Sequence, residues 1–93
     1  MSVEDTLEER AKTYGDFGGG IALHALIMGA ICQRYSSEQH GMDMPEIDKA
    51  NISMNVMKLT RLSVTPDHID SWHDIAGYAT LVEKELRKNA KSK

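Results

Sequence analysis

Two aspartates in the C-terminal third of the chain have the spacing of a carboxylate pair on a helix. Asp70 and Asp74 are four residues apart, so both carboxylates project from one face if the segment is helical. Like charges at this spacing repel each other, which implies a compensating partner. Mg²⁺ prefers oxygen ligands of this kind, so the pair is a candidate metal site and catalytic site, and Tyr78 continues the same face.

Two basic residues come shortly before this pair. Lys58 and Arg61 are three residues apart, and an antiparallel hairpin would bring them close to Asp70 and Asp74. One interpretation is an ion-pair cluster that holds the hairpin together. The other is a site for an anion or a metal-bound phosphate, in which the two basic residues and Tyr78 bind the substrate.

Two asparagines and one further aspartate each allow either a structural or a ligand-binding interpretation. Asn51 and Asn55 can hydrogen-bond across an interface, or Asn55 can contact the base or sugar of a ligand. Asp16, which follows Tyr14-Gly15 and precedes three glycines, can cap a helix or add an oxygen ligand. The four histidines lack the spacing of a zinc site, and Cys32 is interpreted as a small core residue.

Hydrophobic periodicity predicts an all-α fold in a single domain, 1–93. Apolar residues recur at helical spacing over 2–14, 21–39, 45–62 and 66–89, with Gly15 and the three glycines at 18–20 separating the first two segments. Ser2 and Thr65 are predicted N-caps, Trp72 is predicted to turn inward, and residues from about 90 to 93 are predicted to form a frayed basic tail. Since the two middle helices are apolar on both faces, we expect this small bundle of three to four helices to be completed by oligomerisation.

Composition excludes several classes of protein. The formal net charge of −3 argues against binding to duplex nucleic acid. No apolar run approaches the roughly 20 residues that a membrane span needs, and the acidic N-terminus does not resemble a secretory signal. The single cysteine is compatible with a reducing compartment, so we expect a cytoplasmic protein.

Two motifs together resemble a family of small phage and prophage proteins. One runs from Lys58-x-x-Arg61 through Pro66-Asp67-His68-x-Asp70-Ser71-x-x-Asp74-Ile75-Ala76-Gly77-Tyr78, and the other is Arg10-x-x-x-Tyr14-Gly15-Asp16. The helices are more distantly similar to the MazG-like, all-α nucleoside triphosphate pyrophosphohydrolases, which release pyrophosphate from nucleotides with Mg²⁺. This resemblance implies a MazG-like bundle, a nucleotide ligand, Mg²⁺ held by Asp70 and Asp74, and the cytoplasm of an infected or lysogenic bacterium.

The chain departs from the MazG-like pattern at the first of its two acidic pairs. The basic residues Lys58 and Arg61 stand where two carboxylates are expected, while Asp74 matches the last acidic position and Ser71 replaces its neighbour. Either Glu46, Asp48 or Asp16 compensates, or nucleotide affinity persists without hydrolysis, or both are lost. The resemblance therefore favours a Mg²⁺-dependent pyrophosphohydrolase or a degenerate nucleotide-binding relative, forming a homodimer or homotetramer. The alternative is a non-catalytic oligomeric phage accessory protein that binds a host protein or sequesters a small ligand.

Overall fold

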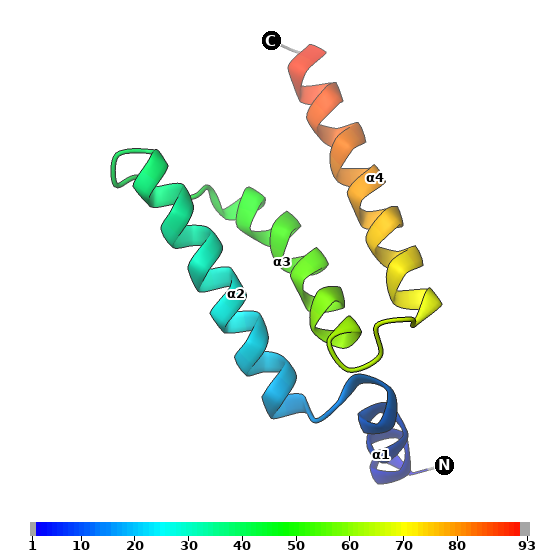
Figure 1. Ribbon diagram of the computed structural model, residues 1–93. Coiled ribbons are helices and arrows are strands. Elements are labelled where there is room, and N and C mark those ends of the chain that lie inside the picture. The colour runs from blue at the N-terminus through cyan, green and yellow to red at the C-terminus, as the bar shows by residue number, and fades with distance from the viewer. Residues whose placement is uncertain (1, 92–93) are drawn as a thin grey trace.

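The computed structural model describes residues 2–91, which form four helices joined by short turns (Figure 1). The helices are α1 (Val3–Tyr14), α2 (Phe17–Glu38), α3 (Glu46–Leu62) and α4 (Ile69–Lys91). No strand occurs in this part of the chain, so the predicted all-α fold is confirmed. Of the predicted frayed tail, residues 90 and 91 are still helical, and the last two residues lie outside the described part.

The first two helices begin at side-chain caps. The Ser2 hydroxyl accepts a hydrogen bond from the Asp5 backbone N–H at 3.1 Å, and the Asp5 carboxylate accepts one from the Ser2 N–H, which completes a capping box. Asp16 caps α2 by accepting from the Gly19 N–H at 2.8 Å. The predicted break at the three glycines is therefore wrong: the cap allows α2 to begin at Phe17 and to include them.

The fourth helix begins later than its sequence predicts. Thr65 does not cap it, because the Thr65 hydroxyl donates to the Thr13 carbonyl at the end of α1. His68 takes the capping position instead. Its carbonyl accepts from the Trp72 N–H at 3.3 Å, and its ring Nδ1 accepts from the Ser71 N–H at 3.3 Å. A tertiary contact to α1 thus overrides the local preference of threonine for a cap.

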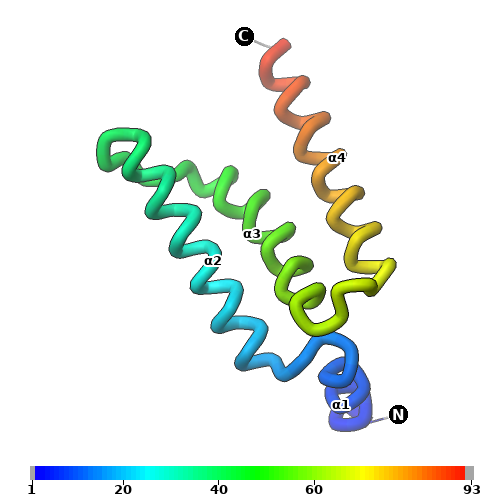
Figure 2. Tube along the Cα trace, viewed as in Figure 1, coloured from blue at the N-terminus to red at the C-terminus, as the bar shows by residue number. Residues whose placement is uncertain are grey.

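Three helices form a single layer. Helix α3 lies in the middle, with α2 on one side and α4 on the other, and α2 and α4 do not contact each other (Figures 1 and 2). Helix α1 lies across the end of this layer, close to the turn between α3 and α4, and contacts α2 and α3. The C-terminal part of α4 leans away from α3 (Figure 2). The layer thus has no second layer over its faces.

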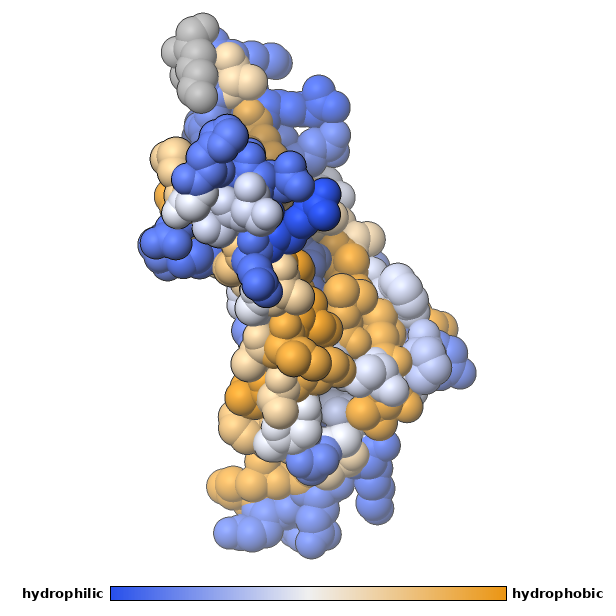
Figure 3. Space-filling model, turned by 60° about the vertical axis from the view of Figure 1, so that its left-hand side comes forward, coloured by the Kyte–Doolittle hydropathy of each residue, from blue (hydrophilic) through white to orange (hydrophobic). Residues whose placement is uncertain are grey.

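Very little of the chain is buried. The buried described residues are few, and none lies in α1 or α2: Met44, Val56, Thr60, Leu62 and Ser71. Trp72, predicted to turn inward, is 52% exposed, because its indole N–H donates to the Pro66 carbonyl at 2.8 Å in the turn. Figure 3 shows a broad hydrophobic surface between hydrophilic ends.

The surface area and the radius of gyration both exceed those of a compact protein of this mass. The accessible area is 7223 Å², whereas a folded monomer of 10.4 kDa is expected to expose about 5,400 Å². The radius of gyration is 16.0 Å, against about 12 Å for a compact domain of this length. The single chain therefore leaves apolar surface in water that a compact fold would cover.

Within residues 2–91, no single helix is both long and apolar enough to cross a bilayer. Helices α1 and α2 reach that length and composition only as a pair, which is bent by 48°.

Candidate functional site

The hairpin of α3 and α4 brings Lys58 and Asp74 together. The Lys58 ammonium lies 3.0 Å from Oδ2 of Asp74 and 5.9 Å from the centre of the Tyr78 ring. The Lys58 side chain is 13% exposed and that of Asp74 44% exposed, so the lysine is the more enclosed partner. The juxtaposition predicted for these three residues is present.

The ion pair changes the acidity of Asp74. The hydrogen bond from the Lys58 ammonium is the main reason that the pKa of Asp74 lies below its ordinary value of 3.8. Partial burial opposes this shift in pKa, and the positive charge of Lys58 adds to it. The carboxylate is therefore ionised and occupied by a cation at neutral pH.

We expect Asp74 to make stability depend on pH in the acid range. Because its pKa is lower in the folded than in the unfolded state, its contribution is complete above about pH 4 and is lost as pH falls through the folded pKa. Asp74→Asn should lower the Tm at pH 7 by a few degrees, because it leaves the enclosed Lys58 ammonium without a counter-charge, and should flatten the acid-side decline. Thermal melts followed by circular dichroism between pH 7 and pH 2 measure both effects.

The matched control for this prediction is Asp70→Asn. Asp70 is exposed and makes no hydrogen bond or ion pair among the described residues, so its amide variant leaves Lys58 paired and should lower the Tm less than Asp74→Asn does. A profile of Asp74→Asn that parallels the wild type would show that the ion pair contributes nothing to folding.

The two aspartates have different surroundings in the structure. Asp74 forms an ion pair with Lys58, whereas Asp70 is exposed in the first turn of α4. Among residues 2–91, no three histidine, cysteine, aspartate or glutamate side chains lie close enough to hold a metal ion. Of the two Mg²⁺ ligands that the resemblance implies, Asp74 is therefore paired with Lys58, and Asp70 is the carboxylate without such a pair.

The carboxylates that could have compensated are placed elsewhere. Asp16 accepts a hydrogen bond at the start of α2, and Glu46 pairs with Lys49 at 3.1 Å at the start of α3. Asp48 is exposed in the same turn as Glu46. None of these three is shown in contact with Lys58 or Asp74.

Arg61 contacts α1, and its charge makes only the last of the contributions that lower the pKa of Asp74. Its guanidinium lies 4.6 Å from the centre of the Tyr14 ring. The Tyr14 ring in turn makes an edge-to-face contact with the His68 ring, with 5.4 Å between the ring centres and 88° between the ring planes. A guanidinium over an aromatic face is held by the ring's electron density, which fixes its position. The predicted basic pair is thus divided, with Lys58 at the ion pair and Arg61 at a separate aromatic contact.

Around Arg61 lies a polar groove with a volume of about 380 Å³. We call it the arginine groove, and its lining comes from α1, the end of α3 and the turn before α4: Thr6, Glu9, Arg10, Thr13, Tyr14, Arg61 and His68. The lining contains two guanidinium groups and one carboxylate, so its net charge is positive. Arg10 makes no ion pair or hydrogen bond among the described residues, and its five N–H donors are available to a ligand.

His68 is fixed by the helix that it caps. Its Nδ1 accepts from the Ser71 backbone N–H and lies 2.8 Å from the Ser71 hydroxyl, which belongs to a side chain that is 2% exposed. The two contacts with Ser71 hold the ring by its Nδ1 edge. The ring therefore joins the arginine groove in one defined orientation.

Sequence reasoning found only part of the arginine groove. It predicted Arg61, but it did not place His68, Thr13 or Thr6 in a binding site. The available signal was the spacing of Arg10 and Tyr14, which are four residues apart and therefore share a face of α1. What was missing was the contact between α1 and the end of α3, which joins residues some fifty positions apart.

Asn55 lies in a different groove. Its amide Nδ2 donates to the Asn51 carbonyl at 3.2 Å, while its Oδ1 is buried without a hydrogen-bond donor. Both asparagines face α4 rather than the arginine groove. The predicted substrate-binding residues are therefore distributed over three places: the ion pair, the arginine groove and the groove around Asn55.

The comparisons with known proteins give one match. Residues 3–86 match the family described as Domain of unknown function (DUF6378). No curated protein and no solved structure matches the chain.

Proposed function

The chain belongs to the DUF6378 family, and from this premise and the geometry above we propose that it is a nucleotide-binding protein. In this proposal it is a MazG-like, homo-oligomeric phage or prophage protein that acts in the bacterial cytoplasm and binds nucleotides through their phosphates. The observation that carries the proposal is the arginine groove, in which Arg10 and Arg61 face the same space.

Guanidinium groups are well suited to bind phosphate oxygens. Their planar N–H donors match two oxygens at once, and the bonds are strengthened by the charges on both sides. Arg61 is already positioned over Tyr14, so little side-chain freedom is lost when a phosphate binds. Glu9 repels a phosphate at one side of the groove, which favours binding near the two arginines.

The MazG-like part of the proposal is supported by the helical hairpin. The resemblance assigns the nucleotide site to the hairpin of α3 and α4, and the Lys58–Asp74 pair and Arg61 lie on this hairpin. The homo-oligomer, a dimer or a tetramer, is supported by the open single layer and its large accessible area.

Calorimetric titration of the full chain with a nucleoside triphosphate tests the proposal. Arg10 is exposed and makes no hydrogen bond or ion pair with another described residue, so Arg10→Gln should leave the Tm unchanged. The same variant loses a charged donor of the arginine groove and should bind the nucleotide about tenfold more weakly. Arg34→Gln is the control, because Arg34 is an exposed arginine of α2 that pairs only with Glu38. Equal affinity of the two variants, or no heat of binding with the wild type, would refute phosphate binding in the arginine groove.

We propose binding rather than hydrolysis, because the Lys58 ammonium neutralises Asp74, one of the two carboxylates that the resemblance assigns to Mg²⁺. The same preparations should therefore release no pyrophosphate from nucleotides in the presence of Mg²⁺ or Mn²⁺. Pyrophosphate release that is abolished by Asp74→Asn would instead establish the pyrophosphohydrolase activity that the resemblance implies.

A second candidate is the non-catalytic accessory protein that binds a host protein. It is favoured by the exposed apolar side chains, among them Phe17 at 84% and Ile69 at 79% exposure. In that case the Lys58–Asp74 pair serves only to stabilise the hairpin. A chain that binds no nucleotide but co-purifies with one host protein at fixed stoichiometry would favour this candidate.

A further inference from the structure

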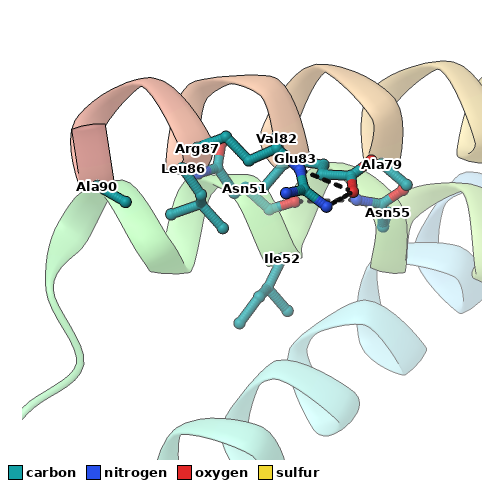
Figure 4. A pocket seen from close by; sticks show the side chains of 9 residues that line it. All are labelled: Asn51, Ile52, Asn55, Ala79, Val82, Glu83, Leu86, Arg87 and Ala90. Atoms are coloured by element: carbon teal, nitrogen blue, oxygen red, sulfur yellow. Dashed lines mark hydrogen bonds and ion pairs between the residues drawn. The ribbon is translucent and has the colours of Figure 1, made fainter.

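A second groove lies between α3 and α4, where the two helices diverge. Its volume is about 510 Å³, and we call it the α3–α4 groove (Figure 4). The surface that lines it is almost entirely apolar, although it includes the ion pair of Glu83 and Arg87 at 2.9 Å. The aliphatic side chains that the argument uses are Ile52 from α3, and Val82 and Leu86 from α4.

Asn55 is incompletely satisfied in this groove. Its buried Oδ1 has no donor within the described residues, and its Nδ2 is already engaged with Asn51. A buried carbonyl oxygen without a donor costs free energy in an apolar environment. Because this oxygen is shielded from the surface, its missing donor is a cost within the chain that a partner in the groove does not relieve.

We infer that the α3–α4 groove is the surface on which a second copy of this chain packs, groove to groove about a two-fold axis. A helical layer needs a second layer over its apolar face, and α2, α3 and α4 form only one. The area in excess of a compact monomer is about 1,800 Å² per chain, more than the roughly 800 Å² that each partner buries in a standard interface.

The charges of the groove are compatible with such a pairing. A two-fold axis brings the same surface of both chains together, so a surface that carries one acidic and one basic residue is complementary to itself. Glu83 and Arg87 are paired within each chain, so the pair brings no net charge into the interface.

The buried Oδ1 of Asn55 is shielded within the chain and takes no part in this pairing. This inference rests on the homo-oligomer of the proposed function but not on its nucleotide.

Two leucines of α4 provide a matched test. Leu86 lines the groove and is 55% exposed, whereas Leu81 is 61% exposed on the same helix and lies outside the groove. Light scattering coupled to size-exclusion chromatography should give the mass of an oligomer for the wild type and for Leu81→Glu. Leu86→Glu should give the mass of a monomer, because it places a charge in the apolar interface of both copies.

Each outcome decides a different question. A wild type of monomeric mass overturns both the homo-oligomer and this interface, while leaving nucleotide binding to be judged by calorimetry. An oligomeric Leu86→Glu, or a monomeric Leu81→Glu, overturns the assignment of the surface alone. If Leu86→Glu loses its helical circular dichroism, Leu86→Ala replaces it in the test, because it adds no charge. This variant should raise the dissociation constant of the oligomer at least about tenfold, and an unchanged constant overturns the assignment.

Discussion

Replacing Gly15 by alanine is expected to lower the free energy of unfolding by about 2–3 kcal/mol. Gly15 ends α1 with φ 81° and ψ −176°, a backbone conformation that is essentially restricted to glycine. A Cβ built there would lie 2.8 Å from Cγ2 of Val64, so the side chain also collides with the turn after α3. Chemical denaturation of the full chain, with the midpoint and slope compared to those of the wild type, measures the loss.

The control for this variant is Gly29→Ala. Gly29 lies inside α2, and a Cβ built on it meets nothing within 4 Å. Alanine is a better helix former than glycine, so this variant should be stabilised by about 0.5–1 kcal/mol. If the two variants were equally stable, the junction of α1 and α2 would not be held against the α3–α4 turn as the structure describes.

Replacing Arg61 by alanine is expected to weaken binding of a nucleoside triphosphate about ten- to a hundredfold. Its guanidinium is the group of the arginine groove whose position is fixed, through its contact with the Tyr14 ring at 4.6 Å. Removal takes away charge-assisted hydrogen bonds and also the ring contact that joins α3 to α1. Calorimetric titration gives the dissociation constant, and a thermal melt reports the accompanying loss of stability.

Arg61→Lys separates these two effects. The lysine keeps the positive charge near Tyr14 but lacks the planar fork, so affinity should fall between those of the wild type and the alanine variant. Arg34→Ala, on the exposed side of α2, should leave both affinity and Tm unchanged. If all three variants bound the nucleotide as tightly as the wild type, the phosphates would not lie in the arginine groove.

The local features of the fold could be predicted from the sequence, but the tertiary ones could not. The caps at Ser2 and Asp16 are short-range hydrogen bonds, and the residue types that make them are specific. The predicted start of α4 was wrong because the Thr65 hydroxyl donates to the Thr13 carbonyl, and these two residues are far apart in the chain. The inward orientation of Trp72 was wrong for a similar reason, since its N–H binds the Pro66 carbonyl in the turn.

Only the part of the candidate site that depends on neighbouring helices could be predicted from the sequence. The pairing of Lys58 with Asp74 follows from two helices joined by a short turn, so spacing and charge were sufficient. Arg61 was assigned to the same cluster, but it lies one turn further along α3, where α1 crosses. No periodicity in the sequence shows which helix end crosses another, so the arginine groove needed coordinates.

The central claim is that nucleotide phosphates bind between α1 and the end of α3. Backbone amide shifts of the ¹⁵N-labelled full chain, recorded during titration with a nucleoside triphosphate in the presence of a chelator, locate the ligand directly. The account predicts that the largest changes cluster in residues 6–14 and 61–71, which carry the lining of the arginine groove. Changes centred on residues 79–90 of the α3–α4 groove, or the absence of any change at saturating nucleotide, would contradict it.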